Sequence, residues 1–218
     1  MGGKFIAGRY LFLLLVITLY NSCRKEPKIN EHTTVGIIPY QGVSNQDLNV
    51  ISKSIAKYYG IKVKILSRQI LPKDAFINIK SPRYRADSII AVQNRNLPVG
   101  IDYVLGITGR DISITKYDIK GAIKKPVWRY NDFGIMGLAY CPGKSCIVSD
   151  FRLKSNKKLH LERYKKVVIH ELGHNFGLPH CADKKCVMTD AVESIKTIDN
   201  ANPVLCIKCR NRIIYKNI

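Results

Sequence analysis

Apolar and polar residues alternate in blocks along the first half of the chain, and these blocks predict strands and helices in turn. The predicted elements are a strand over 33–39, a helix over 44–59, a strand over 61–66, a helix over 83–94 and a strand over 103–107. Ser44 suits the N-cap of the first helix, and Gly60 can end that helix in a left-handed conformation. This order of strands and helices predicts an α/β fold built around a central sheet.

The second half of the chain adds further strands and one long amphipathic helix. The segments 111–117 and 134–140 have strand character, and the Cys-Pro-Gly-Lys-Ser-Cys segment at 141–146 predicts a hairpin turn after the second of them. Four apolar residues at intervals of four predict a helix that buries one stripe under the sheet: Tyr164, Val168, Leu172 and Phe176. The opposite face of this helix is then available for polar side chains.

The same helix contains the pentapeptide His170-Glu171-Leu172-Gly173-His174. Two imidazoles four residues apart project from one side of a helix, one turn apart, so they can bind the same metal ion. Glu171 lies beside them, where a general base is needed. Such pentapeptides also arise by chance on the surfaces of helices, so the residues that follow decide how this one is interpreted.

A third imidazole follows shortly after the helix. Gly177 can adopt the positive φ that ends a helix and redirects the chain, which would bring His180 back toward the other two histidines. Three of the five histidines in the chain lie between positions 170 and 180, a concentration that ordinary core or surface histidines do not explain. Three protein nitrogens leave the fourth position of a tetrahedral zinc ion open to water, which is typical of a catalytic site.

The cysteines form two further groups. Four of them lie in two close pairs and suit either a tetrahedral structural zinc or two disulfides: Cys181, Cys186, Cys206 and Cys209. Cys141 and Cys146 flank the predicted hairpin turn, where they could form a disulfide in an oxidising compartment or remain thiols.

The sequence from His170 to Cys209 resembles the archaemetzincins, a family of zinc-dependent metzincin peptidases. The shared pattern is HExxHxxGxxH followed by a cysteine, four residues, a second cysteine, one residue and Met188, and then, after seventeen residues, a CxxC pair. Weaker similarity extends upstream through 83–86, 106–112, 137–139 and 149–153. The resemblance therefore covers most of the chain after its first thirty residues or so.

This resemblance implies a twisted mixed sheet over the active-site helix, with a catalytic core at 33–180 and a small C-terminal subdomain at 181–218. It implies that Met188 packs beneath the metal in a Met-turn and is not a ligand. It also implies two zinc ions per chain: one catalytic, and one structural that the four paired cysteines bind in the C-terminal subdomain. Aminopeptidase-like cleavage of short peptides is the activity that the family indicates.

The function expected from these residues is zinc-dependent hydrolysis of peptide bonds in a peptide or protein substrate. Glu171 would take a proton from a zinc-activated water and return it to the leaving amine. The alternative is a zinc-binding envelope protein without turnover, in which the same histidines only stabilise the fold or an interface. Metal binding alone requires the histidines but not Glu171, so the carboxylate favours the enzyme.

The charge of the chain narrows the range of partners. Lys and Arg number 36 against 16 acidic residues, a net charge of +20 that is spread through the sequence. No nucleic-acid-binding motif accompanies it, so we expect no nucleic-acid partner. The excess is instead typical of a solvated basic surface close to anionic membrane or envelope polymers, and it hints at acidic peptides as substrates.

The N-terminus predicts export. Lys4 and Arg9 precede the apolar run 11–19, which is the layout of a signal peptide over 1–22 and is short for a membrane-spanning helix. Cys23 follows directly and resembles the acylated cysteine of bacterial lipoproteins, although Tyr20 and Asn21 depart from the usual residues before it. The polar segment 23–32 would be a tether. We therefore expect a monomeric lipoprotein of the bacterial cell envelope, anchored through lipid on Cys23; the alternatives are plain secretion and an uncleaved N-terminal anchor.

Overall fold

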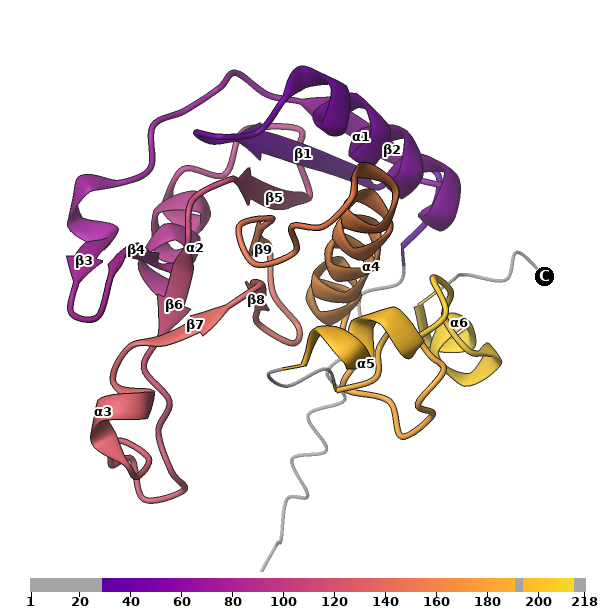
Figure 1. The fold of residues 1–218 in the computed structure, drawn as a ribbon. Coiled ribbons are helices and arrows are strands. Elements are labelled where there is room, and N and C mark those ends of the chain that lie inside the picture. The colour runs from indigo at the N-terminus through magenta and orange to yellow at the C-terminus, as the bar shows by residue number, and fades with distance from the viewer. Residues whose placement is uncertain (1–28, 191–193, 214–218) are drawn as a thin grey trace, which may run out of the picture.

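The residues that the structure describes form two β-sheets, one of five strands and one of four, together with the helices that pack around them (Figure 1). The computed structural model describes residues 29–190 and 194–213. The first sheet consists of β1 (Thr34–Pro39), β2 (Lys62–Ile65), β5 (Tyr103–Thr108), β8 (Gly137–Ala139) and β9 (Ser145–Ser149), in the order β2-β1-β5-β9-β8. The second consists of β3 (Phe76–Asn78), β4 (Pro82–Arg85), β6 (Ile112–Ile114) and β7 (Phe133–Ile135), in the order β3-β4-β6-β7.

Helices cover both faces of the first sheet (Figure 1). On one face α1 (Asn45–Tyr59) packs against α4 (Lys157–Asn175), whereas α2 (Ala86–Arg95) packs on the other. The remaining helices are α3 (Val127–Tyr130), α5 (Ile195–Asn200), α6 (Ile207–Ile213) and the short 3₁₀ turn η1 (Lys73–Ala75).

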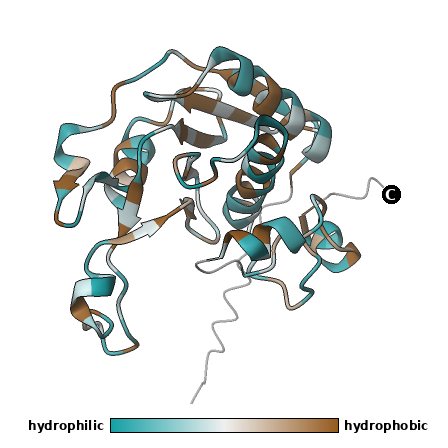
Figure 2. Cartoon of the chain, viewed as in Figure 1, coloured by the Kyte–Doolittle hydropathy of each residue, from teal (hydrophilic) through white to brown (hydrophobic). Residues whose placement is uncertain are grey.

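The first sheet is mixed, and its centre is hydrophobic. β1 is parallel to β2 and β5, β5 is parallel to β9, and only the edge strand β8 is antiparallel to its neighbour. Every residue of β1, β5 and β9 is buried, as expected for parallel strands that are covered on both faces. Figure 2 shows β1 and β5 as largely hydrophobic strands. The mixed sheet with helices on both faces confirms the predicted α/β class.

The first predicted helix has the boundaries that its capping residues indicate. The Ser44 hydroxyl accepts a hydrogen bond of 3.0 Å from the backbone N–H of Asp47. Gly60 ends the helix at φ 66°, and its N–H donates to the carbonyl of Ala56. Local capping chemistry alone fixes both ends of α1, which explains why the sequence was sufficient here.

The second predicted helix begins later than expected. Residues 83–85 were assigned to the helix, but they belong to β4, and α2 begins at Ala86. β4 pairs with β3 on one side and with β6 on the other. Pairing across the sheet therefore overrides the helical preference of these residues, and it also forms β3, which the apolar pattern did not predict.

The predicted strand over 134–140 is divided between the two sheets. Phe133–Ile135 forms β7 and pairs with β6, whereas Gly137–Ala139 forms β8 and pairs with β9. The strand β6 itself is shorter than the strand predicted over 111–117. Met136 lies at the break, and its carbonyl accepts a hydrogen bond from Ser149 N–H. The predicted hairpin turn is confirmed, because β8 and β9 are antiparallel and are joined by residues 140–144.

Helix α4 places its apolar stripe under the first sheet, as predicted. Tyr164, Val168, Leu172 and Phe176 are all at most 1% exposed. At its C-terminal end the buried Asn175 side-chain amide donates hydrogen bonds to the carbonyls of Tyr140 and Ser145. The end of the helix is thereby tied to the connection between β8 and β9.

The C-terminal segment returns to α4 and to the start of the described chain. Arg163 on α4 makes two hydrogen bonds of 2.7 Å with the Asp199 carboxylate on α5. Ile29 is 2% exposed, and its N–H donates to the carbonyl of Ile213. Over residues 29–190 and 194–213, no helix is both long and apolar enough to cross a membrane. The predicted signal peptide and Cys23 lie outside the described residues.

Candidate active site

The structure brings the three histidines of the motif together at the end of α4. One ring nitrogen from each of His170, His174 and His180 lies within 4.8 Å of the other two. Gly177 has φ 89°, the positive value expected from the sequence, and its N–H donates to the carbonyl of His174. This left-handed residue ends the helix and directs the chain back, so that His180 meets the other two imidazoles.

Hydrogen bonds to backbone carbonyls fix two of the rings. Nδ1 of His170 lies 2.8 Å from the carbonyl oxygen of Val187, and Nδ1 of His174 lies 2.7 Å from that of Leu178. A carbonyl only accepts, so we assign the proton of each ring to Nδ1. Each Nε2 then carries a lone pair, the form that binds a metal.

The separation of these lone pairs is suited to a shared cation. Nε2 of His170 and Nε2 of His174 are 3.0 Å apart, and with both rings in this tautomer no proton lies between them. Two lone pairs at this distance repel each other unless a cation binds both. Zinc–nitrogen bonds of roughly 2.0–2.1 Å in a tetrahedron place two nitrogens about 3.3 Å apart, so the donor set fits zinc.

Burial keeps the two helical imidazoles neutral. Burial, and to a smaller extent the neighbouring His174, lower the pKa of His170 to about 4. Burial also lowers the pKa of His174. Both rings are therefore unprotonated near neutral pH, and a metal ion does not have to displace a proton from either of them.

Glu171 lies between the helix and the edge strand β8. It is 8% exposed, and burial raises the pKa of its carboxyl group to about 8. A Cβ atom on Gly137 would lie only 2.5 Å from Glu171 Oε1, so the carboxylate occupies space that the glycine leaves open. A cation bound at the histidines would lower this pKa and favour the ionised carboxylate.

Met188 packs against the histidine-bearing turn of α4. It is fully buried, and a Cβ on Gly173, between His170 and His174, would lie 2.5 Å from the Met188 sulfur. The residue before it supplies the Val187 carbonyl that orients His170. This packing is the role that the family resemblance implies for Met188.

The four paired cysteines form a second cluster in which every sulfur lies within 4.8 Å of the others. The sulfurs of Cys181 and Cys206 are 3.7 Å apart, and those of Cys186 and Cys209 are 3.9 Å apart. Disulfide sulfurs are roughly 2.0 Å apart, whereas zinc–sulfur bonds of about 2.3 Å in a tetrahedron give about 3.8 Å. The donor set and its spacing fit a four-coordinate zinc ion.

Burial raises the pKa of Cys186 and Cys209. Four thiolates in one cluster therefore require a cation to remain ionised together.

Cys141 and Cys146 lie outside this cluster. Cys146 is buried on β9 while Cys141 is exposed, and no disulfide joins them in the described structure.

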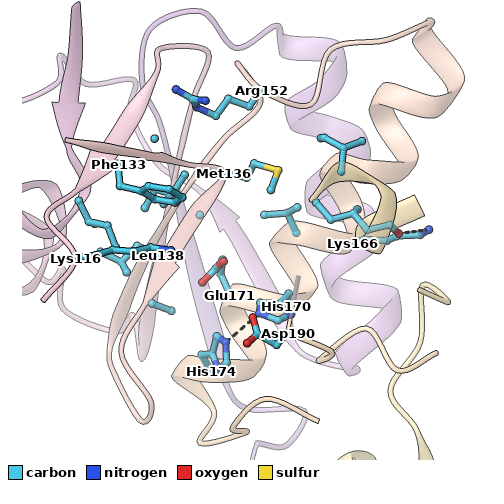
Figure 3. A pocket seen from close by; sticks show the side chains of 18 of the residues that line it. Lys116, Phe133, Met136, Leu138, Arg152, Lys166, His170, Glu171, His174 and Asp190 are labelled. Atoms are coloured by element: carbon cyan, nitrogen blue, oxygen red, sulfur yellow. Dashed lines mark hydrogen bonds between the residues drawn. The ribbon is translucent and has the colours of Figure 1, made fainter. Parts of the chain in front are cut away.

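A cleft with a volume of about 770 Å³ leads away from the histidines (Figure 3). β7 and β8 form one wall, and α4 with the segment around α5 forms the other. Some of its residues were not predicted from the sequence, and they fall into two groups: Gly137 and Asp190 near the histidines, and Lys80, Lys116 and Arg129 at the far end. Gly137 lies in a segment of weak family similarity, but the other residues have no sequence signature, because tertiary folding alone brings them to the cleft.

Comparisons with known proteins agree with this geometry. The family model of peptidase family M54 matches residues 34–215. The archaemetzincin of Haloquadratum walsbyi is 29% identical over 191 residues, which cover 83% of this chain and 99% of that protein. The archaemetzincin of Methanopyrus kandleri is 31% identical over 166 residues, covering 75% of this chain and 83% of that protein.

Solved structures give the same result. A crystal structure of archaemetzincin from Methanopyrus kandleri matches with a TM-score of 0.68 and 28% identity, covering 84% of this chain and 93% of that chain. The crystal structure of archaemetzincin from Archaeoglobus fulgidus, complexed with malonate, matches with a TM-score of 0.67 and 26% identity, covering 83% of this chain and all of that chain. The motifs quoted from the sequence and the overall fold therefore indicate the same family.

Proposed function

The chain belongs to peptidase family M54, the archaemetzincins, and is a zinc metallopeptidase, and on this premise we propose which of its residues perform the hydrolysis. His170, His174 and His180 bind the catalytic zinc, and Glu171 is the general base. The observation that carries this assignment is the pair of unprotonated Nε2 atoms 3.0 Å apart, next to a buried carboxylate. A protein that only bound zinc would need the imidazoles but not Glu171.

A zinc ion at the three histidines would act as a Lewis acid that acidifies a water molecule and polarises the scissile carbonyl. Glu171 accepts the proton of the attacking water and transfers it to the nitrogen of the leaving amine. No side chain is acylated, so hydrolysis takes place in one covalent stage. The carbonyls of Val187 and Leu178 hold the two helical imidazoles in the required tautomer throughout.

The edge strand β8 binds the substrate backbone. Among the strands of the described residues, β8 is the last in the first sheet and pairs with β9 on one side only. An extended peptide can add to such an edge through main-chain hydrogen bonds, leaving selectivity to the side-chain pockets. Gly137 of β8 lies directly against Glu171, so a peptide aligned on this strand passes the general base.

The four cysteines bind a second, structural zinc. Its support is the spacing of 3.7 and 3.9 Å between paired sulfurs, which fits a zinc tetrahedron and not two disulfides. Such a site contributes free energy of folding to the C-terminal segment. The chain would then bind two zinc ions.

The export of the protein remains a proposal from the sequence. Lys4, Arg9 and the apolar run 11–19 before Cys23 support a lipoprotein signal peptide. A lipid on Cys23 would hold the catalytic domain at a membrane through residues 24–28 and those that follow.

The decisive experiment compares the wild type with Glu171→Gln after both have been loaded with zinc. Both proteins are incubated at neutral pH with a library of short peptides that have free or blocked N-termini, with and without a chelator. The variant should keep its zinc and its fold but lose hydrolysis by a factor on the order of 10²–10⁴. Equal activity of the two proteins would refute Glu171 as the base.

The same library tests the type of peptidase. Cleavage restricted to free N-termini supports the aminopeptidase-like activity that the family indicates, whereas cleavage of blocked peptides supports an endopeptidase. A zinc-loaded wild type that cleaves no peptide in the library would favour the alternative of a non-catalytic zinc protein.

A further inference from the structure

The connection between β6 and β7, residues 115–132, forms a lobe that projects away from the two sheets (Figure 1). Its first part is a hairpin in which Tyr117 pairs with Ile123, and its second part contains the short helix α3. At its base the Thr115 hydroxyl donates a hydrogen bond of 2.9 Å to the carbonyl of Asn131. The two ends of the lobe are therefore held together, and they continue into strands that pair with each other.

The lobe exposes four large hydrophobic side chains to the solvent. Ile119 is fully exposed, Trp128 is 71% exposed, and about half of Tyr117 and of Val127 is exposed. Figure 2 shows hydrophobic and hydrophilic residues next to each other in this lobe. A single exposed hydrophobic residue is ordinary, but four between positions 117 and 128 indicate a surface that contacts an apolar environment.

Exposed lysines lie among these hydrophobic residues in the sequence. There are three of them, each exposed: Lys120, Lys124 and Lys125. Only two residues from 115 to 132 are acidic, and neither offsets these lysines at the surface. Asp132 is 1% exposed, and the Asp118 carboxylate accepts the backbone N–H groups of Lys120 and Ala122 within the hairpin turn. The outer part of the lobe therefore combines apolar side chains with cations.

This combination is typical of a surface that contacts a phospholipid bilayer. Trp and Tyr favour the boundary between headgroups and acyl chains, and Lys can bury its aliphatic stem while its ammonium stays among the headgroups. Anionic headgroups attract basic side chains, by about fivefold in affinity for each lysine near the surface. A projecting lobe has no concave surface that would hold a peptide or a helix, whereas a fluid bilayer can deform around it.

We propose that the outer part of this lobe docks on an anionic phospholipid surface, with its exposed hydrophobic side chains in the interface and its three exposed lysines at the headgroups. Ile114 and Phe133, which flank the lobe, line the cleft, so docking also holds this end of the cleft close to the membrane. The proposal depends neither on the peptidase mechanism nor on a lipid at Cys23, because the lobe is a separate part of the surface.

The sequence supplies a direct probe, because Trp128 is the only tryptophan in the chain. The full-length, zinc-loaded protein is mixed with vesicles of phosphatidylcholine alone or with equal parts of phosphatidylcholine and phosphatidylglycerol. Docking should move the emission of Trp128 to shorter wavelength, and phosphatidylcholine brominated on its acyl chains should quench it. Association of the N-terminal region with the vesicles adds no signal, since that region contains no tryptophan.

The charge of the vesicles should decide how much of the lobe is docked. The ratio of docked to free lobe should be on the order of a hundredfold higher on the anionic vesicles, since each of the three lysines contributes about fivefold. High salt should reduce this difference, because it screens the attraction between the lysines and the headgroups.

Charge variants test which lysines are responsible. The lobe variant removes the three exposed lysines of the lobe, and it should dock on anionic vesicles only as much as the wild type docks on neutral ones: Lys120→Gln, Lys124→Gln and Lys125→Gln. The control removes the same charge from exposed lysines of α1 and β2, which lie far from the lobe in Figure 1, and it should dock as the wild type does: Lys53→Gln, Lys57→Gln and Lys64→Gln.

A second pair of variants tests the hydrophobic contact. Ile119→Ser should reduce docking by about tenfold, because the serine no longer buries an apolar side chain in the interface. Ile70→Ser is the matched control, since Ile70 is 77% exposed and lies between β2 and η1, outside the lobe. Before vesicles are added, every variant should match the wild type in zinc content, urea midpoint and Trp128 emission, which reports that the lobe keeps its fold.

Each contrary result overturns a stated part of the proposal. Trp128 emission that stays unchanged and unquenched on anionic vesicles overturns membrane docking and points to an acidic protein surface as the partner. Equal docking on the two kinds of vesicle, or an equal loss in the α1 and β2 control, overturns the role of the lobe lysines. Docking that Ile119→Ser leaves unchanged overturns the hydrophobic contact. Docking that requires the lobe lysines and Ile119 supports the proposal whether or not the protein cleaves peptides.

Discussion

Burial of the Glu171 carboxyl group predicts that the general base destabilises the protein when the histidine site holds no metal. Burial raises the pKa of this group from 4.5 to about 8. At pH 7 the unfolded chain therefore carries an ionised carboxylate, whereas the folded metal-free protein carries a protonated one. Glu171→Gln removes this difference with little change of shape, so the variant should be more stable than the wild type at pH 7.

The sign and the size of the stability difference between Glu171→Gln and the wild type follow from proton linkage. Between pH 4.5 and 8 the folded metal-free protein binds more protons at this group than the unfolded chain does, so the stability of the wild type falls as pH rises through this window. At pH 7 the burial of this carboxyl group lowers the free energy of unfolding of the metal-free wild type by about 3 kcal/mol, and at pH 5 by less than about 1 kcal/mol. Glu171→Gln should therefore be about 3 kcal/mol more stable at pH 7, with a gain that largely disappears by pH 5.

Urea unfolding of chelator-treated protein at pH 5, 6, 7 and 8 measures this gain. Wild type and variant are compared at equal measured zinc content, so that metal retained by the cysteine cluster does not differ between them. Glu162→Gln is the matched control, because Glu162 is an exposed glutamate on the same helix. Its stability should follow that of the wild type at every pH.

Zinc loading supplies the second comparison. A cation at the histidines lowers the pKa of the neighbouring carboxyl group, so the advantage of Glu171→Gln should shrink in the loaded protein. A gain that is equal at pH 5 and pH 7, or a wild type that is the more stable protein at pH 7, would refute the conclusion that burial raises the pKa of the Glu171 carboxyl group.

Three further predictions concern the metals, the cleft wall and the N-terminus. Elemental analysis should find two zinc ions per chain, one lost in His174→Ala and the other in Cys206→Ser; a variant that keeps both contradicts its assignment. In Gly137→Ala the new methyl group would lie 2.5 Å from Glu171 Oε1, so hydrolysis should fall by about a hundredfold with zinc content unchanged, and wild-type turnover would show that the contact is unimportant. Mass spectrometry should find a mature chain that begins with a lipid-modified Cys23, whereas an intact Met1 would disprove export.

The features that could be predicted from the sequence depend on local geometry. The ends of α1 follow from a capping hydroxyl and a left-handed glycine, and the approach of His180 to the helix follows from the positive φ of Gly177. In each case the determining residues lie within a few positions of the feature. The spacing of four between His170 and His174 is likewise a property of any helix.

The features that were missed depend on residues far apart in the chain. Residues 83–85 were assigned to a helix although they pair on both sides in β4, and one of the two partner strands, β6, begins only at Ile112, beyond α2. The division of 134–140 between two sheets depends in the same way on which neighbour each half finds. The contact between Gly137 and Glu171 and the approach of Lys80 to Arg129 connect segments that no spacing rule links.

The two clusters of metal-binding side chains are physically connected through one short segment. Cys181 directly follows His180, and its N–H donates to the carbonyl of Met188 at 2.8 Å. Val187, between the second cysteine and this methionine, supplies the carbonyl that orients His170. The cysteine cluster therefore holds the backbone that positions one catalytic imidazole and restricts another. Loss of the structural zinc should then weaken catalysis through misplaced histidines, although no cysteine touches the substrate.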